Sequence, residues 1–368
     1  MATEDYNHSY NYNYNYDPEE DSLQEVTEEA SPGHLGVAGI LSVVIYSAVC
    51  LLGILGNGLV IVITAFKMKK SVNTVWFLNL AVADFLFNIF LPLYIVYTAM
   101  NHDWIFGTAM CKVNSFLLIH NMYTSVFLLT TISFDRCISV VCPVWSQNHR
   151  NVRLAYGACA VIWVLAFFLS SPSLVFRDTA PAKGRTTCFN NFTLSDPLLE
   201  DRASREAGER RHVAVNVTRF LGGFVLPFIV ITACYLVIVS KLKRNRMAKS
   251  KKPFRIIVTI IVTFFLCWSP YHALGLLELF YHVVPHAVFK LGVPLATALA
   301  VANSCMNPIL YVFMGQDFKK FQVAIFSRLV NALSEETAHS SYLSHRGVTK
   351  MSSMNERSVA NDRETSML

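Results

Sequence analysis

The stretch CKVNSFLLIHNMYTSVFLLTTISFDRCISVV, from Cys111 to Val141, is apolar along most of its length and ends on the charged pair Asp135-Arg136. As a helix it would be about 45 Å long, more than the ~30 Å hydrocarbon core of a bilayer. Because adjacent opposite charges beside apolar residues are costly near lipid, we expect them to face protein or water and to find partners. The stretch therefore predicts a tilted transmembrane helix with a functional charged pair at one end.

The composition extends this prediction to the whole chain. Its 368 residues are 53% hydrophobic and only 15% charged, and the mean hydropathy is +0.40, which indicates an integral membrane protein. The net charge of +6 does not indicate a nucleic-acid partner, because the basic residues cluster after apolar runs, as membrane topology predicts. The nine cysteines include no CxxC pair, and no His/Cys cluster indicates a transition-metal site.

Seven apolar runs of membrane-spanning length are expected, at about 38–66, 72–99, 111–141, 154–176, 213–240, 254–282 and 287–313. The fold class is therefore all-α, a seven-transmembrane helix bundle over residues 38–313. Lysines 67, 69 and 70 follow the first run, and further basic clusters follow the third and fifth. The positive-inside bias places the N-terminus outside the cell and the C-terminus in the cytoplasm, so we expect a multi-pass plasma-membrane protein.

Three segments lie outside the bundle. Residues 1–37 are acidic and contain no Lys or Arg, which predicts a disordered extracellular tail, with Tyr6 and Tyr16 as candidates for sulfation beside acidic residues. Residues 314–328 have apolar and basic residues at helical spacing, which predicts a short amphipathic helix on the inner membrane surface. Residues 329–368 are rich in Ser and Thr and predict a disordered, phosphorylatable cytoplasmic tail. Two N-glycosylation sequons, at Asn7 and Asn191, fall on the expected outer side.

Polar residues recur inside the apolar runs. Asp84 lies midway along the second run, where a carboxylate must be protonated, paired or ion-bound. Two further sets share a helix face with i,i+4 spacing and offer oxygen and nitrogen partners: Asn121 with Ser125, and Asn303 with Asn307 and the adjacent Ser304. These faces are expected to converge on Asp84. Two interpretations stay open, an allosteric sodium site and interhelical hydrogen bonding alone.

Pro227, Pro270 and Pro308 each interrupt one of the runs. Each removes a helical hydrogen bond, and a kink is therefore expected there. Phe264 and Trp268 lie one turn apart just before Pro270. An aromatic stripe of this kind usually belongs to the core, but the adjacent kink favours a hinge.

Two cysteines are placed to join outside the membrane. Cys111 opens the third run at its outer end, and Cys188 is the only cysteine in an expected extracellular connection. An extracellular setting favours oxidation. We therefore expect a Cys111–Cys188 disulfide that holds the long loop over the end of the bundle.

Taken together, these motifs resemble the class A (rhodopsin-like) G-protein-coupled receptors across all seven runs. The matching segments are Gly56-Asn57, Leu80-Ala81-Val82-Ala83-Asp84, Asp135-Arg136-Cys137, Trp163, Pro227 with Tyr235, Cys267-Trp268-Ser269-Pro270, and Asn307-Pro308-Ile309-Leu310-Tyr311 followed by Phe318. Cys137 departs from the family, which usually has Tyr there.

The resemblance implies how activation works. Asp135 is expected to hold Arg136 in the inactive state, and the sixth helix is expected to swing outward at Pro270 and free it. The residues implied in G-protein activation are Asp135, Arg136, Tyr235, Phe264, Trp268, Pro270, Asn307, Pro308 and Tyr311. No enzymatic activity is expected.

Within this family the chain is most similar to the chemoattractant receptors, which include the formyl-peptide and anaphylatoxin receptors. That similarity implies a secreted peptide ligand, inhibitory (Gi/o) G proteins, arrestins, receptor kinases and membrane lipids as partners, and a role in leukocyte chemotaxis. Leu118 stands where amine receptors have an acidic anchor, and Val301 stands where opsins have the retinal lysine. Amine and retinal ligands are therefore excluded.

Two arginines predict the chemistry of the ligand. Arg177 ends the fourth run and Arg219 precedes Pro227 by about two turns, so both are expected to face the outer cavity and to bind a peptide C-terminal carboxylate. The other expected ligand-binding residues are Glu278, Asn190, Phe189, Tyr94, Tyr97, Asn114, Ser115 and Leu276. The alternative is structural: Arg219 pairs with Glu278, and Arg177 extends to the loop beside Asp178.

Two other functional classes compete with a signalling receptor. A transporter would also use seven helices and a membrane carboxylate, but the sequence shows no repeated pair of interrupted helices. A non-signalling decoy receptor would bind ligand without activating G proteins, which the intact Asp135-Arg136 and Asn307 to Tyr311 motifs disfavour.

Overall fold

The structure is a computed structural model that describes residues 37–182, 184–194, 202–244, 252–280 and 283–314. All of these belong to one compact unit. The predictions for the acidic tail, Asn7, the amphipathic helix and the Ser/Thr-rich tail lie outside the described residues, except for Val37 and Met314 at their edges.

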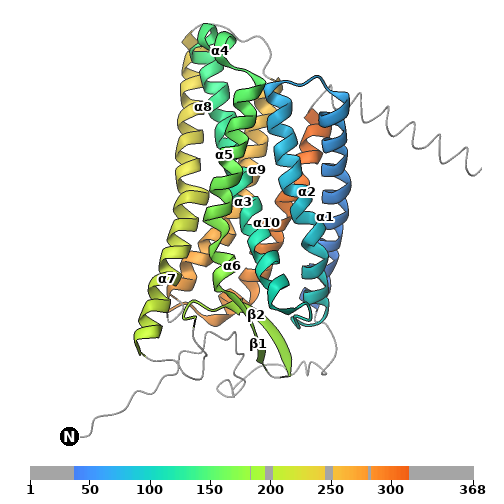
Figure 1. Ribbon diagram of the computed structural model, residues 1–368, viewed down its shortest axis with the longest axis vertical. Helices are drawn as coiled ribbons and strands as arrows, with labels where there is room; N and C mark the ends of the chain where they lie inside the picture. The colour runs from blue at the N-terminus through green and yellow to red at the C-terminus, as the bar shows by residue number, and fades with distance from the viewer. Residues whose placement is uncertain (1–36, 183, 195–201, 245–251, 281–282, 315–368) are drawn as a thin grey trace, which may run out of the picture. The chain divides into compact units, whose positions relative to one another are not determined.

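The described chain forms the predicted helix bundle (Figure 1). Its long helices are α1 (Val37–Val62), α2 (Val72–Ala99), α3 (Gly107–Val141), α5 (Val152–Ser170), α7 (Arg202–Phe220), α8 (Leu226–Arg244), α9 (Lys252–Leu277) and α10 (His286–Met314). Shorter turns extend or join them: the π-helices η1 (Ile63–Lys67) and η2 (Leu221–Val225), the 3₁₀-helix η3 (Glu278–Phe280), α4 (Pro143–His149) and α6 (Pro172–Phe176).

Five stretches of the described residues are long and apolar enough to cross a membrane: Gly39–Lys67, Val72–Ala99, Gly107–Val141, Val152–Phe176 and Arg202–Lys241. α9 and α10 pack on each other and supply the sixth and seventh helices. Large apolar side chains face outward, including Phe66, Leu55 and Leu266, as lipid contact requires. The seven-helix prediction is confirmed.

The helix that contains the opening stretch is central. α3 contacts α2, α5, α6, α8, α9 and the strand β1 (Arg177–Ala182). Its inward side chains are almost fully buried, with Met122, Val126 and Leu128 at 0% exposure and Tyr123 at 1%. Four of the other long helices, α2, α5, α8 and α9, therefore pack directly against it.

A β-hairpin is the main departure from the all-α expectation. β1 pairs antiparallel with β2 (Arg185–Asn190), with Arg177 opposite Asn190 and Thr179 opposite Cys188. The edge of β2 is held by the loop between α2 and α3, because the backbone N–H of Trp104 donates to the Thr186 carbonyl at 2.8 Å. The strands are short and not strongly apolar, so hydropathy did not reveal them.

The fifth membrane helix is longer than predicted. Its first segment, α7, begins at Arg202 rather than at about 213. The added turns are polar and include the i,i+4 ion pair Arg202–Glu206, at 3.4 Å between Nε and Oε1. An apolar window ends where charged residues begin, although the helix continues past that point.

A π-helix lies just before Pro227, where the sequence predicted a kink. η2 covers Leu221–Val225 and joins α7 to α8, and Pro227 is the second residue of α8. A proline has no N–H to offer the preceding turn, and a π-turn is one way a helix accommodates the loss. Gly223 permits close packing here, since a Cβ at this position would lie 2.7 Å from Met122 Cε.

Candidate functional site

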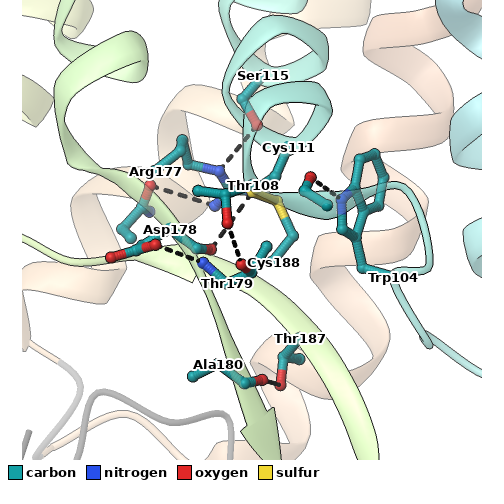
Figure 2. Close-up of a disulfide and its surroundings, with 12 residues drawn as sticks. Trp104, Thr108, Cys111, Ser115, Arg177, Asp178, Thr179, Ala180, Thr187 and Cys188 are labelled. Carbon is teal, nitrogen blue, oxygen red and sulfur yellow. Dashed lines mark hydrogen bonds between the residues drawn. A yellow bond between two sulfur atoms is a disulfide. The ribbon is translucent and has the colours of Figure 1, made fainter.

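The hairpin is fastened to the start of α3. Cys111 and Cys188 form the predicted disulfide, which joins residues 77 positions apart, and Thr108 hydrogen-bonds Thr179 next to it. Figure 2 shows the bridge with Arg177 beside it. The long connection between the fourth and fifth membrane helices is therefore held against α3.

Arg177, the first residue of β1, points back to α3. Its Nε donates to Ser115 Oγ at 2.8 Å and its Nη1 to Asn190 Oδ1 at 3.2 Å (Figure 2 shows the bond to Ser115). Three predicted ligand-binding residues are thus brought together. The structural alternative, in which Arg177 extends to the loop beside Asp178, is not contradicted, because Nη1 and Nη2 bond Asn190 and Cys188 of that loop. The Asp178 carboxylate itself accepts from the Thr179 N–H and the Asn191 side chain.

The environment of Arg177 disfavours its charge. Burial lowers the pKa of the guanidinium from its ordinary value, the phenols of Tyr97, Tyr271 and Tyr94 oppose that effect, and the positive charge of Arg219 lowers the pKa further. No carboxylate in the described part of the chain lies within ion-pair distance of Arg177. An incoming anion would relieve this cost.

Arg219 also has a neutral partner. Its Nη1 donates to the Tyr271 hydroxyl at 3.2 Å. Glu278, the first residue of η3, lies near His212 instead, with 3.8 Å between Oε1 and Nε2. The Arg219–Glu278 ion pair of the structural alternative is therefore not what the structure forms. Sequence reasoning missed Tyr271 and His212, although Tyr271 directly follows the predicted kink at Pro270.

The predicted aromatic walls are partly assembled. Tyr94 and Tyr97 lie 5.9 Å apart between ring centroids, and Tyr97 packs edge-on against Trp104 at 5.6 Å. Among the described residues, no hydrogen bond, ion pair or ring contact joins Asn114, Phe189 or Leu276 to either arginine. Their roles in ligand binding stay predictions.

A second polar cluster surrounds Asp84 in the bundle core. Asp84 is 0% exposed, and its Oδ2 accepts from Asn307 Nδ2 at 2.8 Å. Its Oδ1 has no hydrogen-bond partner among the described residues. Ser125 Oγ donates to Asn121 Oδ1 at 3.3 Å, so each expected i,i+4 set contributes buried oxygens. Asn303 is also buried.

Asn88 extends this cluster in a way that sequence reasoning missed. Its Nδ2 donates to the Asp84 carbonyl at 2.7 Å, and its Oδ1 accepts from Ser304 Oγ at 3.3 Å. Asn88 follows Asp84 by one helical turn, the spacing used for the other two sets, and that signal was available. An uncompensated carboxylate oxygen beside amide and hydroxyl oxygens is a donor set that fits a hard cation such as sodium.

The charged pair of α3 is partnered differently from the prediction. Asp135 pairs with Arg150, at 2.7 Å between Oδ1 and Nε, whereas Arg136 Nη2 donates to Asn73 Oδ1 at 2.6 Å. The expectation that Asp135 holds Arg136 is wrong for this conformation. Arg150 reaches the carboxylate from the segment that follows α4 and occupies both of its oxygens.

The aromatic residues before Pro270 are buried. Phe264 and Trp268 are each 1% exposed, with ring centroids 6.1 Å apart, and Pro270 lies inside α9. Tyr235 is partly buried on α8. Pro308 contacts the position where Gly56 would carry a Cβ, and the side chain of Tyr311 lies outside the described part of the structure.

The sequon at Asn191 lies directly after β2. Asn191 Oδ1 accepts from Thr193 Oγ1 at 3.0 Å and from the Leu194 N–H at 2.9 Å. The side chain is partly buried. Its glycosylation stays a prediction.

Comparison with known proteins places these features in context. Residues 56–311 match the family model "7 transmembrane receptor (rhodopsin family)". The chain is 68% identical to mouse (Mus musculus) Chemerin-like receptor 1 over 345 residues, 93% of each chain. It is 68% identical to the human (Homo sapiens) Chemerin-like receptor 1 over 349 residues, 94% of this chain and 93% of the relative. It is 39% identical to the C3a anaphylatoxin chemotactic receptor of Oncorhynchus mykiss over 343 residues, 92% and 91% of the two chains.

Proposed function

The chain belongs to the rhodopsin family of seven-transmembrane receptors, and from this premise we propose that it is a receptor for chemerin that activates inhibitory (Gi/o) G proteins. Members of the family are signalling receptors, not enzymes. The chain is accordingly a multi-pass plasma-membrane protein with an extracellular N-terminus and a cytoplasmic C-terminus. The ligand and the G-protein class are the parts that we propose.

The observation that carries the ligand proposal is the environment of the two arginines. Arg177 is bonded to the neutral groups of Ser115 and Asn190, and Arg219 is bonded to the neutral Tyr271 hydroxyl. Within the described part of the chain neither arginine forms an ion pair with a carboxylate. Two partly buried cations in this setting favour an anion, and a guanidinium binds a carboxylate with two parallel bonds. The proposed anion is the C-terminal carboxylate of the ligand peptide.

The remaining ligand contacts follow from this anchor. Glu278 and Asn190 would orient the peptide backbone, and the rings of Tyr94, Tyr97 and Phe189 with Leu276 would supply apolar walls, with Asn114 and Ser115 at the α3 side. The acidic residues of 1–37 would attract a basic ligand body and speed its association.

The proposed signalling mechanism is a two-state equilibrium that ligand shifts. The sixth helix, α9, swings outward at Pro270, and Arg136 then becomes available to the G protein, with Tyr235 and Tyr311 stabilising the open state. Arrestins and receptor kinases would act on the cytoplasmic tail, and membrane lipids would contact the amphipathic segment 314–328. In leukocytes this signalling would drive chemotaxis.

We further propose that sodium is an allosteric modulator. Asp84, Asn121, Ser125, Asn303, Ser304 and Asn307 would hold it. The buried Asp84 Oδ1, which accepts no hydrogen bond of good geometry from the described residues, supports this choice. A bound cation would neutralise the carboxylate inside the membrane. The alternative, hydrogen bonding between helices alone, leaves that oxygen uncompensated.

The second candidate ligand is another peptide chemoattractant of the same subfamily. The 39% identity to a C3a anaphylatoxin chemotactic receptor favours another peptide chemoattractant over unrelated ligands. A decoy receptor would bind peptide without signalling, and a transporter would not depend on peptide at all.

One assay separates these functions. Purified receptor in lipid is mixed with purified inhibitory G proteins, and nucleotide exchange is measured with the chemerin C-terminal peptide, with an anaphylatoxin C-terminal peptide and without peptide. We expect stimulation by the chemerin peptide at lower concentration than by the anaphylatoxin peptide. The reverse order would assign the receptor to the second ligand class. Binding without exchange would indicate a decoy, and no binding would contradict the proposal.

A further inference from the structure

Arg150 occupies the carboxylate that was expected to restrain Arg136. Its Nε lies 2.7 Å from Asp135 Oδ1 and its Nη2 lies 2.9 Å from Asp135 Oδ2, a two-pronged geometry that a guanidinium is shaped to form. The side chains of Arg150 and Asp135 are 27% and 12% exposed. The pair is therefore partly shielded from solvent, which makes it stronger than a freely exposed surface pair.

The two arginines also share one neutral acceptor. Asn73 Oδ1 accepts from Arg136 Nη2 at 2.6 Å and from Arg150 Nη2 at 2.6 Å. Two positively charged side chains thus donate to one amide oxygen, and of the two only Arg150 also forms an ion pair with the Asp135 carboxylate. The Nε of Arg136 is buried and has no hydrogen-bond partner among the described residues, so the bonding capacity of Arg136 is not saturated.

Helix caps hold the partners in place. Asn73 lies in the first turn of α2, where Ser71 and Thr74 form a reciprocal capping box. Arg150 follows α4 and directly precedes Asn151, whose Oδ1 caps α5 by accepting from the Leu154 N–H at 2.8 Å. Both residues are therefore presented from backbone segments with few accessible conformations.

A second contact ties the same loop to α3. Ser139 Oγ lies 3.2 Å from Ser146 Oγ, and Ser139 follows Asp135 by one turn, donating to the Asp135 carbonyl at 2.8 Å. α4 is thus attached to α3 next to the charged network. The conformation of this loop therefore determines whether Arg150 neutralises the Asp135 carboxylate beside Arg136.

We propose that Arg150 is a positioning residue for G-protein activation: by engaging Asp135 it keeps that carboxylate from holding Arg136. This inference rests on the proposed function, in which Arg136 carries the signal to the G protein. If Arg150 loses its guanidinium, the Asp135 carboxylate loses its partner, and we expect it to attract Arg136, whose guanidinium lies at the same Asn73 acceptor as that of Arg150. Arg136 is then restrained, and the equilibrium shifts toward the inactive state.

The test compares nucleotide exchange per ligand-binding receptor in the wild type, Arg150→Gln, Arg150→Lys, Asp135→Asn and the double variant Asp135→Asn/Arg150→Gln. Arg150→Gln keeps most of the side-chain stem and removes the charge. Arg153→Ala is the matched control, since Arg153 is an exposed basic residue at the start of α5 outside the network. Peptide binding is measured in each to confirm folding.

We expect Arg150→Gln to lower exchange about fivefold with peptide binding retained, equivalent to about 1 kcal/mol at a tenfold change per 1.4 kcal/mol. Arg150→Lys should recover part of the loss, because it restores the charge without the fork. In the Asp135→Asn background the Arg150→Gln change should have no further effect, because Arg150 acts through that carboxylate. Arg153→Ala should match wild type.

Two results would overturn the inference. Unchanged or increased exchange in Arg150→Gln would mean that the pair does not free Arg136. An equal loss in the Asp135→Asn background would mean that Arg150 acts by another route, such as direct contact with the G protein. Arg136→Ala, measured in parallel, separates the two levels: full exchange in that variant contradicts the proposed function itself, whereas lost exchange with a wild-type-like Arg150→Gln contradicts only the role of Arg150.

Discussion

Asn307 on α10 donates a hydrogen bond of 2.8 Å to the Asp84 carboxylate on α2, and so joins two helices 223 positions apart in the chain. The bond satisfies one oxygen of a carboxylate that is 0% exposed, and the other oxygen has no partner among the described residues. A buried, half-satisfied carboxylate is unfavourable unless another group completes it. A cation at this position is the group that we propose completes it.

Sodium should lower agonist affinity through this carboxylate. Replacing a sodium-free salt with sodium chloride at constant ionic strength should weaken peptide binding to the wild type by about fivefold or more, a usual size for allosteric coupling. Asp84→Asn should lose this response, because the amide cannot neutralise a cation. N-methylglucamine chloride is the control salt. Equal sodium sensitivity in the two proteins would leave interhelical hydrogen bonding as the role of the cluster.

The disulfide should stabilise the hairpin end of the bundle. Closing a loop of 77 residues contributes about 4 kcal/mol in the chain-entropy model. Cys111→Ala and Cys188→Ala should each lower the melting temperature in detergent and weaken peptide binding, and the double variant should lose no more than either single one. A further loss in the double variant would mean that the two thiols act independently.

Two helical glycines should respond oppositely to alanine. A Cβ at Gly53 would overlap the side-chain amide of Asn88, which is bonded to Asp84 and Ser304, so Gly53→Ala should cost about 1–3 kcal/mol. A Cβ at Gly157 on α5 would meet nothing within 4 Å, and alanine should gain about 0.5–1 kcal/mol there from helix propensity. Melting curves of the two variants would test this, and a stabilised Gly53→Ala would contradict the packing described.

Arg136→Ala should separate binding from signalling. The residue lies at the end of α3 away from the hairpin, so saturation binding of labelled peptide should be retained, while nucleotide exchange on purified G proteins should fall to the level seen without peptide. Unchanged coupling would show that another group transmits the signal. Asn73→Ala, which removes the acceptor of both arginines, provides a comparison at the same site.

Hydropathy and charge were sufficient to predict the helices, because a span is a property of many residues together. The seven runs correspond to the membrane helices of the structure within a few residues, except for the polar first turns of α7. The Cys111–Cys188 bond was also predictable, since the topology left few cysteines outside the membrane. These features depend on composition along the chain, which the sequence displays directly.

Partner choice was less predictable. Sequence proximity favoured Asp135 with Arg136, but Arg150, 15 positions along the chain from Asp135, occupies the carboxylate instead. Arg219 was assigned either a ligand or Glu278, and it bonds to Tyr271. Such pairings depend on distances between helices, and several polar residues satisfy the same pattern along the chain. The hairpin was missed for a related reason, because the hydrogen bonds between its two short strands leave no apolar pattern along the chain.

The most direct test of the carboxylate anchor is the effect of amidating the peptide C-terminus on binding to the wild type, Arg219→Ala and Arg185→Ala. Arg185 is the matched control because it is an exposed arginine of the same hairpin, bonded to the Asn101 carbonyl at 2.9 Å. Loss of a charge-assisted bond should weaken binding to the wild type and to Arg185→Ala by about tenfold or more. Arg219→Ala should bind the acid and the amide almost equally, since the partner of the carboxylate is already absent. Equal losses on amidation in all three receptors would contradict the proposal that Arg219 binds the C-terminal carboxylate.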